Sequence, residues 1–272
     1  MKIIGILYHP KLDEARKLAE RLAQSLRSSG YSVWFGSAWE ETEAKNQLDE
    51  SELIISIGGD GTILRTARVL LSHSIPILGV NLGRLGFMTE LSADEAEQRL
   101  PTLLSGKGWT DERSMLQASS IRSGNTFHAL NDVVVGRGAV ARAINVDVNI
   151  DGVYFTSHRV DAVILATATG STAYALAAGG PVLHPESQNI LLQPVATHLG
   201  LGNSLVLPAT ATVKLTIHTY HPGLLSIDGQ INLPLEDGEQ VEVKRSPFLT
   251  RFLRFKPRGS YYSMLAQRLV GK

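Results

Sequence analysis

The stretch Leu53-Ile-Ile-Ser-Ile-Gly-Gly-Asp-Gly-Thr62 joins an uninterrupted apolar run to three glycines and the start of a helical pattern. A short apolar run that ends in glycines is typical of a strand buried on both faces of a parallel sheet. The loop after such a strand lies at its carboxyl end, where the next helix offers unpaired N–H groups to an anion. The stretch therefore predicts an α/β fold with a site for a phosphate group.

The rest of the N-terminal half continues this alternation of strands and helices. An amphipathic helix is predicted over Asp13–Ser28, because Leu18, Leu22 and Leu26 form one stripe and Gly30 follows as a stop signal. The other predicted elements are strands at Lys2–Tyr8, Tyr31–Phe35 and Pro76–Val80 and helices at Thr62–Leu71 and Ala93–Leu104. Buried strands separated by helices predict a parallel sheet for an N-terminal α/β domain of residues 1–106.

Beyond about Trp109 the sequence changes to short alternating strands. Three Asp-Gly pairs, beginning at Asp151, Asp228 and Asp237, separate such strands and predict hairpin turns. The predicted strands are Asn145–Ile150, Val153–Ser157, Thr212–Tyr220, Leu225–Ile227, Ile231–Leu235 and Gln240–Lys244. We therefore predict a mostly antiparallel β domain over residues 107–252. Residues 253–272, with a short helix at Ser260–Val270, are expected to join the N-terminal domain.

Composition excludes several classes of function. Lys plus Arg and Asp plus Glu number 26 each, so the overall charge supports neither a nucleic-acid nor a membrane-surface partner. The chain has no cysteine, which excludes disulfides, thiolate nucleophiles and Cys-ligated zinc. The apolar run in its first residues is shorter than a signal peptide is expected to have, and no run approaches the roughly 20 apolar residues of a membrane span. A cytoplasmic protein is expected.

The glycine loop is the first candidate site. Glycines at 58, 59 and 61 let the backbone approach a phosphate closely, and Thr62 is expected to cap the following helix. A tight turn whose Asp60 only caps the helix is an equally good interpretation of this segment alone. A second loop, Gly79–Phe87, also follows a buried strand. Two glycine loops at one sheet edge predict a cleft.

A third segment runs from Arg159 and Asp161 through a strand to Thr169-Gly-Ser-Thr-Ala-Tyr174 and an Ala-rich helix. If Tyr174 is exposed at the start of that helix, its ring can stack on a flat base, with neighbouring hydroxyl and N–H groups reading the base edge. The alternative, a well-capped packing helix with Tyr174 in the core, is favoured by the residues alone.

Together these segments resemble the NAD kinase family. Gly58-Gly-Asp-Gly-Thr62, Asn131-Asp132 and Gly170-Ser-Thr-Ala-Tyr174 match its signature blocks in order and spacing. Further matches are the Asn81–Phe87 loop, Gly179-Gly180-Pro181 and Asp228-Gly229-Gln230, so the resemblance covers most of residues 53–230. The first block also occurs in 6-phosphofructokinases and in lipid kinases of the diacylglycerol kinase type. The other two blocks distinguish the NAD kinase family from these kinases.

The resemblance implies the NAD kinase/diacylglycerol kinase-like fold, with NAD bound by the β-rich domain. It implies an enzyme that transfers the terminal phosphoryl group of ATP to the 2′-hydroxyl of the adenosine ribose of NAD. Asp60 is the implied catalytic residue, placed to orient that hydroxyl and to take its proton late, because an ionised aspartate is a weak base at neutral pH. The residues implied to bind the nucleotides are Gly58, Gly59, Gly61, Thr62, Arg65, Asn131, Asp132, Arg142, Arg159, Asp161, Thr169, Thr172, Ala173, Tyr174, Ala175, Leu176, Ala177 and Gln230.

Among these, Asn131 and Asp132 are implied to hold the adenosine half of NAD together with Thr172–Ala177. Arg159 and Asp161 are implied to meet the nicotinamide half, in a site that family members commonly share across a subunit interface. Arg65, Arg142 and Gln230 are further implied contacts, although each arginine is read equally well as a solvated surface charge.

The implied partners are ATP, NAD, and a second or further copies of the chain as a homodimer or homotetramer. Mg²⁺ or another divalent cation is implied to arrive with the ATP phosphates, and no dedicated protein cage for it is expected. Two alternatives remain open at this stage. One is another kinase of the same superfamily, acting on a sugar phosphate or a lipid, and the other is a non-catalytic dinucleotide sensor.

Overall fold

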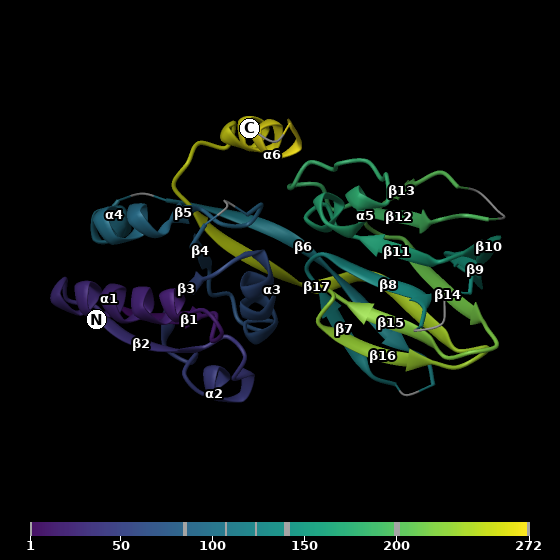
Figure 1. Ribbon diagram of the computed structural model, residues 1–272, viewed down its shortest axis with the longest axis horizontal. Coiled ribbons are helices and arrows are strands. Elements are labelled where there is room, and N and C mark those ends of the chain that lie inside the picture. Colours follow the sequence, from purple (N-terminus) through teal and green to yellow (C-terminus); the bar gives the residue numbers. More distant parts are fainter. Residues whose placement is uncertain are drawn as a thin grey trace. The chain divides into compact units, whose positions relative to one another are not determined.

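The computed structural model describes residues 2–83, 86–106, 108–122, 124–138, 142–198 and 202–270 (Figure 1). Of residues 269 and 270, only the backbone is described. The chain divides into two compact units. Unit 1 comprises Met1–Glu112 with Thr250–Lys272, and unit 2 comprises Arg113–Leu249. The chain passes from one unit to the other twice, within the long strands β6 (Trp109–Ser120) and β17 (Gln240–Arg254).

Unit 1 is built on a parallel sheet with strand order β17-β4-β3-β1-β2, and β5 pairs with β4. The strands are β1 (Ile3–Tyr8), β2 (Ser32–Ser37), β3 (Ser51–Ile57), β4 (Ile77–Asn81) and β5 (Leu91–Ser92). The helices are α1 (Asp13–Ser28), α2 (Glu41–Lys45), α3 (Asp60–Val69), α4 (Ala93–Ser105) and α6 (Ser260–Val270). The α/β fold class predicted for the N-terminal residues is confirmed.

The core of unit 1 follows from the predicted helical stripe. Leu18, Leu22 and Leu26 of α1 are buried, and they form one apolar cluster with alternate residues of β1, β3 and β4 and with α4. Helix α3 lies on the other side of the sheet, where Ile63 packs against Gly79 of β4. The loops after β3 and β4 therefore leave the same edge of a sheet that is covered on both faces.

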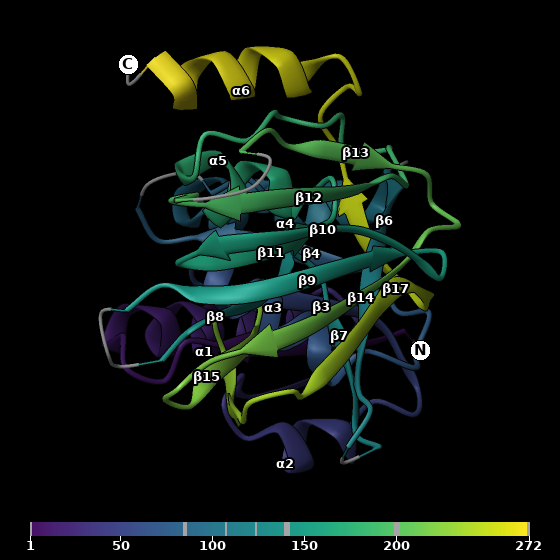
Figure 2. The same ribbon diagram turned by 90° about the vertical axis from the view of Figure 1, so that its right-hand side faces the viewer.

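Unit 2 contains two antiparallel sheets (Figure 2). One has the order β10-β9-β14-β17, with β6 paired to β17 and to β7; the other has the order β13-β12-β11-β8-β15-β16. The strands not yet bounded are β7 (Thr126–Ala129), β8 (Asp132–Arg137), β9 (Ile144–Ile150), β10 (Val153–Val160), β11 (Ala162–Ala166), β12 (Ile190–Val195), β13 (Leu205–Leu207), β14 (Thr212–His218), β15 (Gly223–Ile227) and β16 (Ile231–Leu235). Inward-facing residues of both sheets form one apolar cluster, so the unit is a sandwich.

Two of the predicted Asp-Gly hairpins have the expected backbone. Asp151 and Gly152 have φ of 51° and 82°, and Asp228 and Gly229 have φ of 52° and 64°. Two consecutive residues with positive φ are the mark of a type I′ turn. The Asp228 turn joins β15 to β16 and brings the Asp228 side chain back toward the start of β8.

Within the part of the chain that the structure describes, no helix is long and apolar enough to cross a membrane.

Truncation of the α1 stripe tests this core. Leu22→Ala removes a side chain that is 1% exposed, and it is expected to lower the free energy of unfolding by about 2–5 kcal/mol, because a cavity remains where the side chain packed. Leu12→Ala, at the exposed position that precedes the same helix, is the matched control and is expected to change that free energy by less than about 0.5 kcal/mol. Urea unfolding followed by circular dichroism measures both, and equal effects would contradict the core described above.

Candidate active site

The glycine loop connects β3 directly to α3. The Gly58 N–H donates to the Val80 carbonyl at 2.9 Å, which ties the loop to the neighbouring strand β4. Gly58 has a φ of +152°, and a Cβ atom there would overlap the Thr62 hydroxyl. Both observations require glycine at this position. Gly59 and Gly61 are exposed at the start of the helix, where they leave the backbone open to an anion.

The predicted capping role of Thr62 is wrong. Helix α3 begins at Asp60, its N-cap residue is Gly59, and no side chain caps it. Thr62 lies inside the first turn, where its own N–H donates to the Gly59 carbonyl at 2.9 Å. The helix starts two residues earlier than its apolar pattern indicates, because the extended Gly59 turns the chain directly from the strand into the helix.

Asp60 is held by the backbone of the second glycine loop. Its Oδ2 accepts a hydrogen bond from the Phe87 N–H at 2.7 Å, and its Oδ1 accepts one from the Met88 N–H at 3.1 Å. The loop approaches so closely that a Cβ atom on Gly86 would overlap the Asp60 carboxylate. The position and the orientation of this carboxylate are therefore fixed by main-chain atoms.

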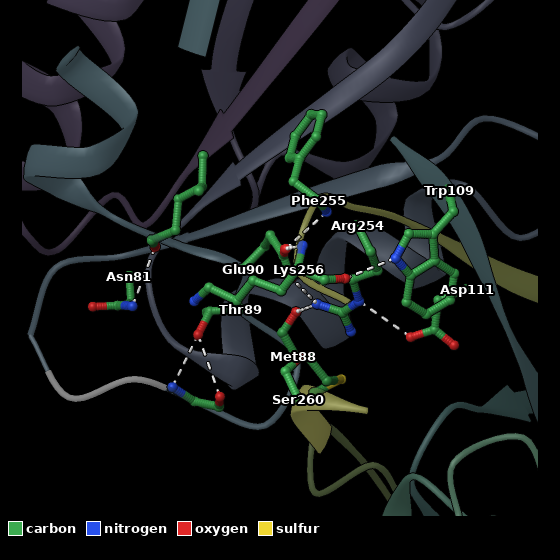
Figure 3. Close-up of polar contacts among 12 residues, drawn as sticks. Asn81, Met88, Thr89, Glu90, Trp109, Asp111, Arg254, Phe255, Lys256 and Ser260 are labelled. Carbon is green, nitrogen blue, oxygen red and sulfur yellow. Dashed lines mark hydrogen bonds and ion pairs between the residues drawn. The ribbon is translucent and has the colours of Figure 1, made fainter. Parts of the chain in front are cut away.

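A buried polar network anchors the same loop (Figure 3). Arg254, at the end of β17, donates to the Met88 carbonyl at 2.9 Å and to Asp111 at 3.1 Å, and it lies 3.4 Å from Glu90. Glu90 in turn accepts the N–H groups of residues 255 and 256, each at 2.8 Å. These three charged side chains are 4–6% exposed, and the two carboxylates compensate the charge of the buried guanidinium. The network thus fixes residue 88, whose N–H contacts Asp60.

The predicted cleft at the sheet edge is present in unit 1. A cavity of about 470 Å³ lies at the carboxyl ends of β1, β3 and β4. Its lining residues are Lys11, Leu12, Asp13, Glu14, Gly58, Gly59, Asn81, Leu82 and Gly83. Both glycine loops contribute to it, as their positions in the sequence predict.

Arg65 does not line this cavity. Its guanidinium lies 4.2 Å from the centre of the Trp39 ring, and the His9 ring lies 4.4 Å from the same indole. Partial burial lowers the pKa of Arg65 and also the pKa of His9. Arg65 is therefore engaged in a stack of side chains beside the glycine loop.

In unit 2, the Asn131-Asp132 pair lies in a turn held by the carboxylate of Asp228, which is not among the site residues that the sequence implies. Asp228 accepts three backbone N–H groups, from Leu130 at 2.9 Å, from Asn131 at 2.7 Å and from Asp132 at 3.0 Å. The Thr167 N–H also donates to the Asn131 carbonyl, at 2.9 Å. The sequence signal for Asp228 was its Asp-Gly turn, which indicates a hairpin but not the distant loop that the side chain binds.

This turn gives the pair unusual chemistry. Asp132 is buried, and burial together with the nearby Asp228 carboxylate raises its pKa to about 7. The side-chain Oδ1 of Asn131 is buried and has no hydrogen-bond partner among the residues that the structure describes. Near neutral pH the pair therefore offers a carboxyl group that can donate as well as accept, and an acceptor left for a ligand.

A second cavity, of about 630 Å³, opens in front of this turn. Of the predicted residues, it is lined by Asn131, Asp132, Asp161, Ala173 and Tyr174, and Arg137, Ser226, Asp228 and Gly229 are among the additional lining residues. Tyr174 begins the short helix α5 (Tyr174–Ala177) and is 46% exposed, so the interpretation of this residue as a core side chain is wrong. Its ring is available to a flat group.

The other predicted residues of this segment do not line the cavity. They are Thr169, Thr172, Ala175, Leu176, Ala177 and Gln230. Ala175 is fully buried, and Thr169 is buried and accepts a hydrogen bond from Arg113 at 3.2 Å. Ala175, Leu176 and Ala177 belong to the helix that begins at Tyr174.

A third cavity, of about 1260 Å³, brings together the remaining predicted residues of unit 2. Arg142, Arg159 and Asp161 line it, with His198 and His218 among the others. Asp161 also lines the second cavity, and it forms an ion pair with Arg137 at 3.3 Å. The sequence analysis did not single out Arg137, because nothing local to it indicates its partner.

Within the described ranges, no group of three or more His, Asp or Glu side chains is arranged to hold a metal ion. The oxygen-bearing side chains in the cavity of unit 1 are those of Asp13, Glu14 and Asn81. A hard divalent cation prefers oxygen ligands and commonly retains several waters, so this donor set fits an ion that is delivered by a phosphate ligand.

Two family models match this chain. The model of the ATP-NAD kinase N-terminal domain matches residues 45–108, and the model of the ATP-NAD kinase C-terminal domain matches residues 130–255. The first match contains the glycine loop and Asp60, and the second contains the Asn131-Asp132 turn.

Similarity to known proteins extends over the whole chain. An NAD kinase from Dehalococcoides mccartyi is 46% identical over 99% of this chain and 96% of its own length, and one from Chloroflexus aurantiacus is 41% identical over 98% of each. The structure of an NAD kinase from Archaeoglobus fulgidus in complex with ATP superposes with a TM-score of 0.80 at 26% identity, covering 99% of both chains. Yeast NADH kinase complexed with NADH has the same fold, with a TM-score of 0.86 at 22% identity over 100% of this chain and 88% of its own.

The glycine loop with its held carboxylate, the Asn-Asp turn with its exposed tyrosine, and similarity along the full length lead to one conclusion: this chain belongs to the NAD kinase family.

Proposed function

We propose that the protein transfers the terminal phosphoryl group of ATP to the 2′-hydroxyl of the adenosine ribose of NAD, giving ADP and NADP. The observation that carries this proposal is the Asp60 carboxylate, held rigidly at the end of a phosphate-type glycine loop. Full-length similarity to NAD kinases favours this reaction over a sugar-phosphate kinase, a lipid kinase or a non-catalytic sensor.

Asp60 is the proposed catalytic residue. Phosphoryl transfer passes through a loose transition state, so the protein contributes mainly alignment and charge stabilisation. The two N–H groups on Asp60 hold both of its oxygens in fixed positions, which suits a group that orients the acceptor hydroxyl and accepts its proton late in the reaction.

The cavity of unit 1 is the proposed site for the phosphates of ATP. Gly58 and Gly59 line it, and they let main-chain atoms approach the phosphate oxygens closely. A divalent cation, with Mg²⁺ the expected one, would neutralise phosphate charge when bound, and Asp13 and Glu14 would hold it there. We further propose that this site is supported by Gly61, Thr62 and Arg65.

The cavity of unit 2 in front of Asn131 is the proposed site for the adenosine half of NAD. The unpaired Asn131 oxygen would read a base edge, Asp132 would bond a ribose hydroxyl, and the Tyr174 ring would stack on the base. Thr169, Thr172, Ala173 and Ala175–Ala177 shape this pocket. Arg159 and Asp161 are proposed to meet the nicotinamide half, with Arg142 and Gln230 as further contacts.

We also propose that the protein acts as a homo-oligomer, either a dimer or a tetramer, and that it works in the cytoplasm. Light scattering of the purified protein measures the first of these directly.

Asp60→Asn tests the proposed role of the carboxylate. Without it, kcat for NADP formation is expected to fall by about 100-fold or more, while the KM for NAD changes much less. The assay supplies ATP, Mg²⁺ and NAD and detects NADP with an NADP-specific dehydrogenase. Asp94→Asn replaces an exposed carboxylate in the first turn of α4 and serves as the matched control. Near-normal turnover of a folded Asp60→Asn variant would refute the role.

Gly86→Ala tests whether the close approach of the loop matters. The added Cβ would overlap the Asp60 carboxylate, so the carboxylate must move, and kcat is expected to fall by roughly 10-fold or more. Gly36→Ala is the control, because a Cβ there meets nothing within 4 Å. A crystal structure of the Gly86→Ala variant with Asp60 in its original place and full activity would contradict this reasoning.

Asp132→Asn tests the raised pKa. Because Asp132 has a folded-state pKa of about 7 and an ordinary value of 3.8, its ionisation opposes folding, and the penalty grows as pH rises from about 4 to about 7. Asparagine does not ionise, so the variant is expected to gain stability relative to the wild type over this range, by up to about 4 kcal/mol. Urea unfolding without nucleotides at several pH values measures the difference. Glu236→Gln, at an exposed carboxyl group of the same unit, is the control, and stability curves for Asp132→Asn and wild type that stay parallel would exclude the effect.

A further inference from the structure

Arg268, in the last turn of α6, places its guanidinium beside the loop that holds Asp60. Its Cζ atom lies 4.3 Å from the centre of the Phe87 ring. The N–H of the same Phe87 donates to the Asp60 carboxylate at 2.7 Å. One residue of the loop therefore contacts both a cation and the proposed catalytic carboxylate.

Among the described residues, no group forms a hydrogen bond with the guanidinium of Arg268. All three of its nitrogens are buried, and none has a partner among the residues that the structure describes. Burial lowers the pKa of Arg268, and the nearby Asp60 carboxylate acts in the opposite direction. A guanidinium has five N–H donors, and buried donors are nearly always paired in native proteins.

A purely structural role explains these observations poorly. The contact with the Phe87 face is a cation–π interaction, which satisfies no N–H donor and is a modest attraction beside the desolvation of a charged group. Arg254 is a structural arginine of the same unit: it donates to Met88, and its charge is balanced by Glu90 and Asp111. Its positive charge also contributes to the lowered pKa of Arg268. The donors of Arg268 have no such partners among the described residues, which leaves them to be completed by an anionic ligand.

Phosphoryl transfer supplies such an anion. Negative charge is spread over the three equatorial oxygens of the transferred group, and preorganised donors at those oxygens lower the barrier. We propose that Arg268 is a catalytic residue whose guanidinium donates hydrogen bonds to the phosphoryl group during its transfer, an inference that rests on the proposed function.

The step itself balances without a further reactant. The bond between the γ-phosphorus and the oxygen that bridges to the β-phosphate breaks, and its electron pair leaves with ADP. A new bond forms between the acceptor hydroxyl oxygen and the γ-phosphorus. The hydroxyl proton passes to Asp60 and then to solvent, while Arg268 remains protonated throughout.

The first test compares Arg268→Gln and Arg268→Lys with the wild type in the NADP assay. Arg268→Gln is expected to lower kcat by about 100-fold or more, with the KM for NAD changed by less than about threefold, because the lost contact forms only during transfer. Arg268→Lys keeps the charge but loses the forked donors, so an intermediate kcat is expected. Arg258→Gln is the matched control. Arg258 precedes α6 and stacks at 4.5 Å on the Trp109 ring, and its loss is expected to leave kcat unchanged.

The second test is rescue of Arg268→Ala with millimolar guanidinium ion, which a structural role would not produce. Recovery of kcat by about 10-fold or more, with no recovery in Asp60→Asn, supports the proposal. A folded Arg268→Gln or Arg268→Lys variant with wild-type kcat overturns it, and so does an Arg268→Ala variant whose lost activity guanidinium does not restore. If the wild-type protein forms no NADP from ATP and NAD, both the proposed function and this inference are wrong. If the wild type forms NADP and the Arg268 variants keep the same kcat, only this inference is wrong.

Discussion

The site in unit 1 depends on the two hydrogen bonds that the main chain of Phe87 and Met88 donates to Asp60. These bonds link the segment after β3 to the loop after β4, so the two parallel strands together fix the position of one carboxylate. Gly86 makes the approach possible, because any side chain there would displace the carboxylate. Arg254 then anchors Met88 from the far end of the sequence, since main-chain loops at a sheet edge are otherwise free to shift.

Unit 2 uses a carboxylate in the opposite way. The two carboxylate oxygens of Asp228 accept three N–H groups of the Asn131 turn. Asp228 is therefore a structural acceptor, and few of its lone pairs remain for a ligand. Its negative charge also raises the pKa of the buried Asp132 beside it. Two acidic residues in one cavity thus acquire different chemistry from their surroundings: one holds the loop, and the other is poised near neutrality to exchange a hydrogen bond with a hydroxyl group.

The sequence predicted what is local and missed what is distant. Helix α1 agrees with its predicted bounds because its apolar stripe and Gly30 are signals within one element. Strand β8, which begins at Asp132, was not predicted, although its apolar run Val133–Val135 before Gly136 resembles the run that predicts the strand before Gly58. The roles of Asp228 and Arg254 were also out of reach: Arg254 contacts Met88 from 166 residues away, and no spacing in the sequence encodes such a contact.

Buried polar atoms without partners carry the remaining information about ligands. In the part of the chain that the structure describes, such side-chain atoms belong to Thr62, Asn131, His158 and Arg268. Thr62 follows the glycine loop, Asn131 lines a cavity, and Arg268 lies beside the loop that holds Asp60. His158 lies inside β10, and burial lowers its pKa, which favours its uncharged form. A guanidinium stays protonated even when it is buried. The lack of partners is therefore stronger evidence for an anionic ligand at Arg268 than for any ligand at His158.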